Sequence, residues 1–267
     1  MKNQLILARG AEAVIELKDN LIIKDRISKS YRIKELDDKI RKQRTKAEKK
    51  LLEKASKIIN APKPLNEEQL REYKLIPHRE GGRDERAKLQ ERIIMPFIEG
   101  EKLSEHLDSF PLEKQKEICK IIGQEIAKLH DADIIHGDLT TSNMILVDKS
   151  KVKKENIPII EPCDKDLSGL TKSQRSALTK SGAKQSIASD SEPIIFFIDF
   201  GLGYISRKIE DKAVDLHLLK QAMEAKHFKN WEILFREVIE GYKNYKESQK
   251  VLERLKAVEK RGRYKEH

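Results

Sequence analysis

The sequence contains few cysteines, few aromatic residues and no long apolar run. Only 2 of its 267 residues are cysteines, Cys119 and Cys163, and neither lies in a C-x-x-C pair or near a histidine at metal-ligand spacing. The pattern indicates neither a disulfide framework nor a zinc site, so both thiols are expected to be reduced. No apolar stretch approaches the ~20 residues of a membrane span, and the first apolar stretch turns charged at Arg9, too early for a signal peptide. We therefore expect a cytoplasmic protein.

Charged residues are abundant and unevenly distributed. They make up 37% of the chain against 38% hydrophobic residues, which fits a globular protein with a charged exterior. The formal net charge is +10, with a local basic excess of 8 in residues 24–57 and of 4 in residues 250–267. These zones favour a polyanionic partner such as a nucleic acid, although charged helix faces often only keep a protein in solution.

The order of the predicted elements indicates a two-lobed α+β fold. A meander of three short strands precedes one long helix and a buried strand, and helices dominate the second half. We expect an N-lobe at residues 1–98 and a C-lobe at 99–267 that carries a flexible insertion at 149–193 and a basic tail at 260–267. The strands are predicted at Leu5 to Ala8, Ala13 to Leu17, Leu21 to Lys24, Ile93 to Ile98, Met144 to Val147 and Ile194 to Ile198. The helices are predicted at Lys34 to Asn60, Lys114 to His130, Asp211 to Ala225, Trp231 to Tyr245 and Lys246 to Lys260, and the connection from Asn60 to Arg92 is expected to hold only local helix.

The strongest local signal is the run from His136 to Asn143, H-G-D-L-T-T-S-N, followed after two strands by Asp199-Phe200-Gly201. Phosphoryl transfer requires metal ions held by oxygen ligands, a cation on the phosphates and a carboxylate that orients the attacking oxygen. Asp138 is the expected orienting or deprotonating carboxylate. Asn143 and Asp199 offer the amide and carboxylate oxygens that magnesium prefers. The two segments predict an enzyme that uses ATP and magnesium.

This order of motifs resembles the protein-kinase superfamily. The resemblance implies that Lys24, at the end of Ile22-Ile23-Lys24, is the strand lysine that grips the α- and β-phosphates. It also implies that Glu48, on the long helix, is the ion-pair partner of that lysine. The remaining nucleotide-binding positions that it implies are a phosphate loop at Gly10, Ala11, Glu12 and Ala13 and an adenine-side hinge at Met95, Phe97 and Ile98.

The chain also departs from ordinary protein kinases. Its phosphate loop has one glycine, Gly10, where they carry G-x-G-x-x-G. Gly137 stands where they carry the arginine that reads a phosphorylated activation loop. No A-P-E segment follows Gly203, and a helix is predicted to begin at Asp211, which leaves little platform for a peptide. The substrate therefore need not be an ordinary peptide.

The altered set of motifs is similar to the PRPK family, the small kinases of the KEOPS complex, over nearly the whole chain. The insertion at 149–193 and the long connection before Ile93 depart from that family. The similarity is carried by Gly10-Ala11-Glu12-Ala13, Lys24-x-Arg26-x-x-Lys29-x-Tyr31-Arg32, Leu36-Asp37, Arg44-Thr45-x-x-Glu48, the run from His136 to Asn143, Asp199-Phe200-Gly201-Leu202 and Lys212-Ala213-Val214-Asp215-Leu216.

The resemblance implies a subunit that hydrolyses ATP beside a threonylcarbamoyltransferase (TsaD-like) subunit and other KEOPS subunits. That complex forms threonylcarbamoyladenosine in transfer RNA. The resemblance also implies Ser/Thr kinase activity, including autophosphorylation. Arg261, Arg263 and Tyr264 resemble the family's basic tail and are expected to contact transfer RNA or the partner.

Other interpretations remain open on the sequence. Aminoglycoside and choline kinases share a similar H-G-D and D-F-G pattern, so a small-molecule phosphotransferase is one alternative. A catalytically inactive scaffold and a kinase acting on diverse proteins are two others. Some residues near the motifs have structural explanations: His136 is expected to pack behind the loop, and Asp215 to accept backbone N–H groups of that loop.

Overall fold

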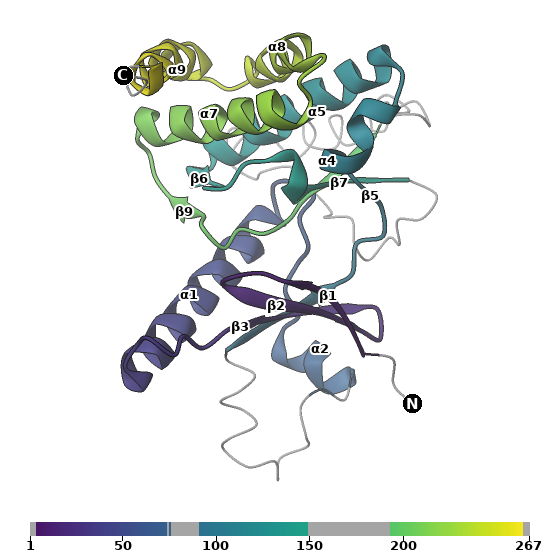
Figure 1. Cartoon of the computed structure of the whole chain (residues 1–267), viewed down its shortest axis with the longest axis vertical. Helices are drawn as coiled ribbons and strands as arrows, with labels where there is room; N and C mark the ends of the chain where they lie inside the picture. Colours follow the sequence, from purple (N-terminus) through teal and green to yellow (C-terminus); the bar gives the residue numbers. More distant parts are fainter. Residues whose placement is uncertain (1–3, 74, 76–90, 149–192, 264–267) are drawn as a thin grey trace, which may run out of the picture.

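The computed structural model describes residues 4–73, 75, 91–148 and 193–263, without the side chains of residues 262 and 263. Figure 1 shows two lobes, one built on a sheet and one mainly helical, which confirms the predicted α+β class. The predicted insertion, except for Pro193, lies outside the described residues, as does Cys163. None of the described helices is long and apolar enough to cross a membrane.

The N-terminal sheet is the predicted antiparallel meander with one further strand. Its order is β1 (Gln4–Arg9), β2 (Ala13–Lys18), β3 (Leu21–Arg26) and β4 (Arg92–Pro96). The strand predicted to reach Ile98 ends at Pro96, because its partner strand β3 begins opposite it at Leu21. Phe97 makes one further bond beyond the strand, from its N–H to the carbonyl of Asn20 in the β2–β3 turn.

The two faces of this sheet contact different parts of the protein, because successive side chains of a strand point to opposite sides. On β3, Ile23 belongs to a small apolar cluster with Ile94 of β4 and Leu70 of the short helix α2 (Glu67–Glu72). Ile22 and Lys24 lie on the other face, which is directed toward the helical lobe and lines the cleft described below. We call the face that carries Ile23 the outer face.

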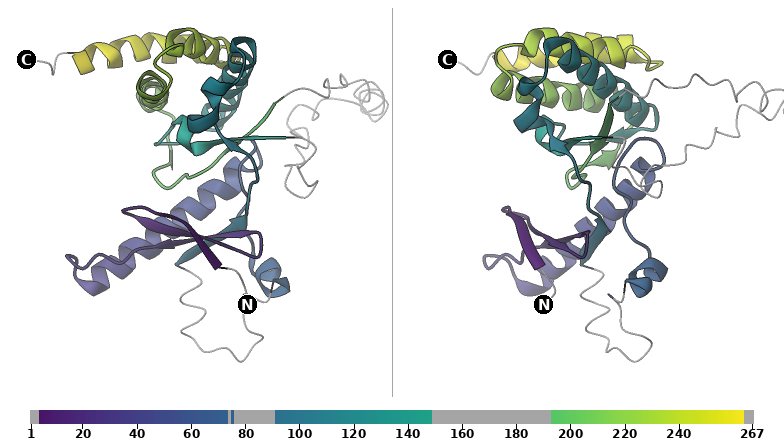
Figure 2. Two further views of the ribbon diagram at one scale, coloured as in Figure 1. Left: turned by 45° about the vertical axis from the view of Figure 1, so that its right-hand side comes forward. Right: turned by 90° about the vertical axis from the view of Figure 1, so that its right-hand side faces the viewer.

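The long helix α1 (Lys34–Ala55) connects the sheet to the helical lobe, as Figures 1 and 2 show. Its buried stripe is polar at Thr45 and Glu48 and apolar at Leu52 and Ala55. The helix ends five residues before the predicted Asn60, because the next backbone bonds close tight turns onto Ala55. Its polar half therefore lies beside the sheet and its apolar end enters the main core.

The helical lobe follows the predicted order and adds several very short elements. The predicted strands become β7 (Met144–Val147) and β8 (Ile194–Phe197). The predicted helices become α5 (Leu112–Asp131), α7 (Ile209–Lys226), α8 (Trp231–Tyr242) and α9 (Ser248–Arg263). Several elements are too short to be predicted from sequence periodicity. They are β5 (Glu101–Lys102), α4 (Leu103–His106), β6 (Ile134–Ile135), β9 (Tyr204–Ile205) and the 3₁₀ turns Leu107–Ser109 and Thr141–Asn143.

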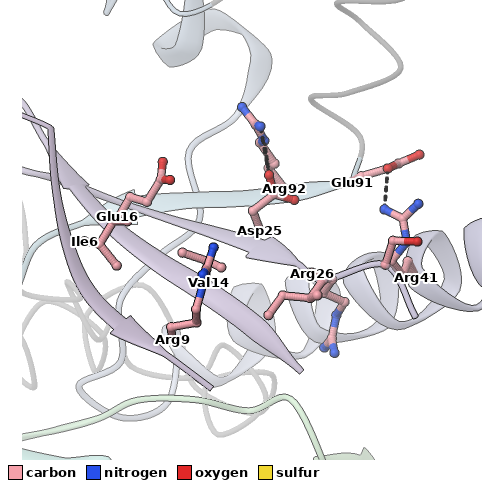
Figure 3. A pocket seen from close by; sticks show the side chains of 11 residues that line it. Ile6, Arg9, Val14, Glu16, Asp25, Arg26, Arg41, Glu91 and Arg92 are labelled. Carbon is pink, nitrogen blue, oxygen red and sulfur yellow. Dashed lines mark hydrogen bonds and ion pairs between the residues drawn. The ribbon is translucent and has the colours of Figure 1, made fainter. Parts of the chain in front are cut away.

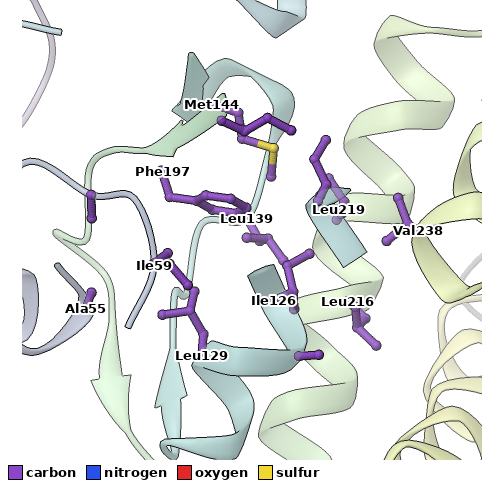
Figure 4. Close-up of a cluster of buried hydrophobic side chains, with 14 of the residues drawn as sticks. Ala55, Ile59, Ile126, Leu129, Leu139, Met144, Phe197, Leu216, Leu219 and Val238 are labelled. Carbon is purple, nitrogen blue, oxygen red and sulfur yellow. The ribbon is translucent and has the colours of Figure 1, made fainter. Parts of the chain in front are cut away.

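One hydrophobic cluster spans the two lobes. Ala55 and Ile59, at the end of α1, are buried in the same cluster as Ile126 and Leu129 of α5 and Phe197 of β8 (Figure 4). The end of α1 is thus anchored in the helical lobe, and the position of the helix relative to the loop from His136 to Asn143 is fixed by packing.

Helices α5 and α8 approach so closely that two glycines lie at the contact. A Cβ added to Gly123 would lie 1.9 Å from the carbonyl oxygen of Val238, and one added to Gly241 would lie 2.0 Å from that of Lys120. Both carbonyl oxygens belong to helix backbone, which cannot change its conformation locally as a side chain can. Glycine at these positions therefore sets the distance between the two helices.

We expect Gly123→Ala to lower the free energy of unfolding by about 3 kcal/mol, because the helices must separate to admit the methyl group. Gly10→Ala is the matched control, since a Cβ there would find its nearest neighbour at 3.7 Å. Urea denaturation of both variants measures the difference. Equal stabilities would show that the α5–α8 contact yields easily.

Candidate active site

A cleft of about 410 Å³ lies between the sheet and the helical lobe. Its walls are mainly aliphatic: Ile15 and Ile22 come from the sheet, and Ile145 and Ile198 come from β7 and the segment after β8. Size and lining suit a small organic molecule with a flat apolar part. Of the residues predicted from the sequence, the cleft is lined by Lys24, Met95, Phe97, Ile98, Asn143 and Asp199.

Lys24 joins two carboxylates at the polar part of this cleft. Its Nζ lies 2.6 Å from Oε1 of Glu48 on α1 and 2.6 Å from Oδ1 of Asp199, which follows β8. The Lys24 and Glu48 side chains are almost fully buried, whereas 42% of the Asp199 side chain is exposed. Three residues that are far apart in the sequence thus form one ionic cluster that opens into the cleft on the Asp199 side.

Asp199 has the backbone and the charge of a functional residue. Its φ of 61° lies in the left-handed region, which is costly for a residue with a side chain. Burial would raise the pKa of the carboxyl, but the Lys24 ammonium and the N–H of Gly201 outweigh it and hold the pKa below its ordinary value. Asp199 is therefore ionised at neutral pH and directed at the cleft.

Asn143 holds the carboxylate of Asp138 in place. Its Nδ2 donates to the main-chain carbonyl of Asp138 at 2.9 Å and to Oδ2 of the same residue at 2.9 Å. The amide nitrogen is therefore occupied, and the amide oxygen of Asn143 is the group that remains to bind a cation. The bond also orients Asp138, so that its other carboxylate oxygen can accept from a substrate.

The donor set can be tested against magnesium. The described residues contain no group of three or more His, Cys, Asp or Glu side chains that could hold a metal ion. Asp199 and Asn143 offer two oxygen ligands in one cleft. Magnesium at kinase sites is held by one or two protein oxygens and completes its coordination with water and substrate phosphates. The residues present fit that mode of binding.

Asp215 of α7 supports the loop from His136 to Asn143 from behind, and the prediction that it accepts backbone N–H groups there is confirmed. Its carboxylate accepts the N–H of His136 at 2.8 Å and that of Gly137 at 2.9 Å, and Nε2 of His130 lies 3.3 Å away. Burial would raise the pKa of Asp215, but these partners hold it below its ordinary value. The carboxylate is thus a fixed acceptor that sets the backbone of the loop.

Gly137 shows why the loop lacks the usual arginine. Its φ is 79°, and a Cβ there would lie 2.3 Å from the carbonyl oxygen of Leu202. Any side chain would therefore meet the backbone of the segment that follows Asp199. The loop and that segment are in direct contact, which leaves no room for an arginine that reads a phosphorylated residue.

His136 packs behind the loop, as predicted, and its hydrogen bonds define its protonation. It is fully buried against Phe200, its Nε2 lies 3.1 Å from the carbonyl of Ile198, and its Nδ1 lies 3.3 Å from the N–H of Asp138. Nε2 must therefore donate and Nδ1 must accept, which requires the neutral ring. Burial is also the main cause that lowers the pKa of His136.

The stability of the protein should fall as the solution becomes mildly acidic. Because the pKa of His136 in the folded state lies below 6.5, the unfolded chain binds more protons at this residue as pH falls through that value. We expect the free energy of unfolding to decrease between about pH 7 and about pH 5, and His136→Asn to remove part of the decrease. Urea denaturation across this range tests it, with the exposed His106→Asn as control. An identical pH profile for His136→Asn and the unmodified chain would contradict the assignment.

Several predicted residues do not line the cleft. The turn that contains Gly10, Ala11, Glu12 and Ala13 joins β1 and β2, and Glu12 pairs there with Arg44 at 2.8 Å. In the tail, Arg261 pairs with Glu210 at 2.7 Å, while the Arg263 side chain and Tyr264 lie outside the described residues. Their roles in binding phosphate or RNA stay predictions.

Sequence reasoning named Arg26 only as part of a family motif, with no role in the site, and it missed most of the aliphatic walls. Arg26 is buried beside Glu48, with Nη2 2.6 Å from Oε2. Its position two residues after Lys24 on one strand was an available signal, since such residues share a face. Ile15 and Ile22 could have been assigned to the cleft from the same alternation of side chains along a strand. Pro62, from the segment after α1, reaches the cleft through tertiary structure that no local pattern shows.

Comparison with known proteins gives three further findings. Residues 21–161 match the model of the lipopolysaccharide kinase (Kdo/WaaP) family. The chain is 33% identical to "KEOPS complex subunit Bud32" of Pyrococcus abyssi, over 98% of this chain and 93% of the relative. It is 31% identical to a "probable serine/threonine-protein kinase BUD32 homolog" of Archaeoglobus fulgidus, over 96% and 95% of the two chains.

A third relative is longer than this chain. A "probable bifunctional tRNA threonylcarbamoyladenosine biosynthesis protein" of Methanococcus maripaludis is 30% identical over 97% of this chain, which corresponds to 36% of the bifunctional protein. In that organism a sequence of this kind is thus one part of a larger polypeptide.

Proposed function

The chain belongs to the Bud32 family of KEOPS-complex kinases, and from this premise we propose that it binds ATP and magnesium in the cleft between its lobes. We infer that it serves a KEOPS complex in the formation of threonylcarbamoyladenosine in transfer RNA, by hydrolysing ATP beside a threonylcarbamoyltransferase (TsaD-like) subunit. It also transfers phosphate to Ser/Thr, including its own.

The main observation behind the proposal is that Lys24 contacts both Glu48 and Asp199. A buried ion pair fixes the lysine, and the second carboxylate faces a cleft whose other walls are aliphatic. Such a site can hold an adenine ring between the aliphatic side chains and the phosphates beside the lysine ammonium. Met95, Phe97 and Ile98 line the same cleft at the predicted adenine-side hinge.

Each site residue has a separate role in the proposed reaction. Asp138 accepts the proton of the attacking hydroxyl or water, or orients it, while Asn143 holds Asp138 in position. Lys24 would contact the α- and β-phosphates, and Asp199 and Asn143 would hold magnesium through their side-chain oxygens. When bound, magnesium would supply positive charge to the phosphate oxygens.

The longer relatives support a close partner. A sequence of this kind forms 36% of a bifunctional protein of threonylcarbamoyladenosine biosynthesis. Two activities that share one polypeptide in one organism commonly work side by side as separate subunits in another. We infer that this chain docks on a threonylcarbamoyltransferase subunit, and that its basic zones and tail face transfer RNA.

A small-molecule phosphotransferase is the second candidate, because residues 21–161 match the lipopolysaccharide kinase family model. Both candidates use the same cleft and loop, and they differ in the acceptor of the phosphate. The fate of the γ-phosphate therefore separates them.

The test follows γ-labelled ATP with magnesium, for the unmodified chain and Asp199→Asn, with and without the transferase subunit and transfer RNA. We expect free phosphate whose release increases when the partner and RNA are added, and no turnover by Asp199→Asn. Label that accumulates on a sugar or another small molecule, with no response to the partner, would favour the second candidate.

A further inference from the structure

We propose that Arg26 is a positioning residue that holds Glu48 in its catalytic position independently of Lys24. The inference rests on the proposed function, because it treats the Lys24, Glu48 and Asp199 cluster as the phosphate-binding part of the site. It gives a role to the buried guanidinium of Arg26, which the ion pair between Lys24 and Glu48 does not itself require.

The geometry divides the Glu48 carboxylate between two cations. Nζ of Lys24 lies 2.6 Å from Oε1, and Nη2 of Arg26 lies 2.6 Å from Oε2. All three side chains are at least nine-tenths buried. The arrangement follows from the strand period, since Lys24 and Arg26 lie on the same face of β3, and from the small Ala13 opposite Arg26 in the sheet register.

The shared position of Lys24 explains why a second cation is needed. The Lys24 ammonium also contacts Asp199, so one positive charge serves two carboxylates. Phosphate groups attract the same ammonium during the reaction. With Arg26 on Oε2, the buried Glu48 keeps a charged partner while Lys24 turns toward phosphate, and α1 stays in place.

Glu12 is the competing partner of Arg26, and distance and burial exclude it as the main one. Nη1 of Arg26 lies 3.9 Å from Oε2 of Glu12, whose side chain is 53% exposed and is already paired with Arg44. Exposed pairs of this length contribute little, whereas a buried pair at hydrogen-bond distance is costly to break. Arg26 therefore acts on Glu48.

The outer face of the sheet supplies a matched control. Arg92 pairs there with Asp25 at 2.8 Å, and both residues line a hollow of about 360 Å³. Figure 3 shows these two side chains meeting while the end of the Arg26 side chain points away from them. Arg92→Met thus removes an arginine that pairs with a carboxylate across the same sheet, but on the face opposite the cleft.

The first experiment compares Arg26→Met, Arg26→Lys and Arg92→Met in steady-state ATP turnover. We expect Arg26→Met to lower kcat by about tenfold to 100-fold and to change KM for ATP by less than about threefold. Arg26→Lys should recover a large part of kcat, because a lysine two residues away already reaches the same carboxylate. Arg92→Met should keep the unmodified kcat. An Arg26→Met enzyme with unmodified kcat would overturn the proposal.

A double-mutant cycle separates positioning from a general effect on folding. Glu48→Gln removes the group through which Arg26 acts, so adding Arg26→Met to Glu48→Gln should lower kcat no further. The double variant is also charge-balanced, and we expect it to melt at a higher temperature than Glu48→Gln alone, which leaves Arg26 buried without its carboxylate. If Arg26→Met costs the same in both backgrounds, Arg26 does not act through Glu48.

The two proposals fail in different ways. If the unmodified chain and Asp199→Asn turn over ATP equally slowly, the proposed function fails, and the melting temperatures of the cycle still test the Arg26–Glu48 pair. If the unmodified chain is active and the cycle shows no coupling in kcat, the inference on Arg26 fails alone.

Discussion

Asp138→Asn is expected to lower kcat for ATP cleavage by about 100-fold to 10,000-fold, the range typical of a lost general base. Asparagine keeps the shape of the side chain and removes the charge that accepts or orients the proton of the attacking oxygen. Affinity for the nucleotide should change little, because Asp138 does not line the described cleft. Single-turnover cleavage of γ-labelled ATP, with a parallel measurement of nucleotide affinity, separates the two effects.

Asp19→Asn is the control for this substitution. Asp19 is exposed in the β2–β3 turn with a φ of 51°, a conformation that asparagine adopts as readily as aspartate. The control should keep the unmodified kcat. Similar kcat values for Asp138→Asn and the unmodified chain would show that another group orients the attacking oxygen.

Asp215→Ala is expected to destabilise the protein and to inactivate it together. The change leaves the buried N–H groups of His136 and Gly137 without their acceptor, and His130 loses a partner as well. Each unsatisfied buried group costs about 1–3 kcal/mol, so we expect a loss of about 3 kcal/mol or more. For a chain of this size that loss lowers the melting temperature by roughly 6–12 °C. Thermal denaturation and ATP turnover measure the two effects on one preparation.

Asp211→Ala on the same helix provides the comparison. Asp211 is only partly buried and accepts from the Ser206 hydroxyl near the surface. Its removal should cost less than about 1 kcal/mol. Equal destabilisation by the two substitutions would mean that Asp215 does not hold the loop.

Much of the fold could be predicted because local patterns were strong. Alternation of apolar residues and the Asp19-Asn20 turn identified the meander, and the apolar stripe from Ile118 to Leu129 identified α5. Two-residue strands such as Ile134–Ile135 could not be predicted, because their pairing with Tyr204–Ile205 depends on how the loop and the segment after Asp199 meet. Element ends shifted by a few residues where turns decided them.

The candidate site, like the fold, could be predicted from the sequence only in part. Ordered motifs were enough to indicate Lys24, Glu48, Asp138, Asn143 and Asp199, and the structure brings the first two together with Asp199. They were not enough for Arg26, whose contact becomes visible only when β3 and α1 are packed. The motif around Gly10 predicts a loop beside phosphate, but in the structure this turn is tied to α1 through Glu12 and Arg44.

The central claim is that Asp199 and Lys24 mark a site for ATP and magnesium. The most direct measurement is calorimetric titration of ATP into the unmodified chain and Asp199→Asn, with and without magnesium, with Asp25→Asn on the outer face as control. We expect magnesium to tighten binding to the unmodified chain and the control by about tenfold or more, and to add nothing for Asp199→Asn. A gain from magnesium that is equal in all three proteins, or no binding of ATP to any of them, would contradict the account.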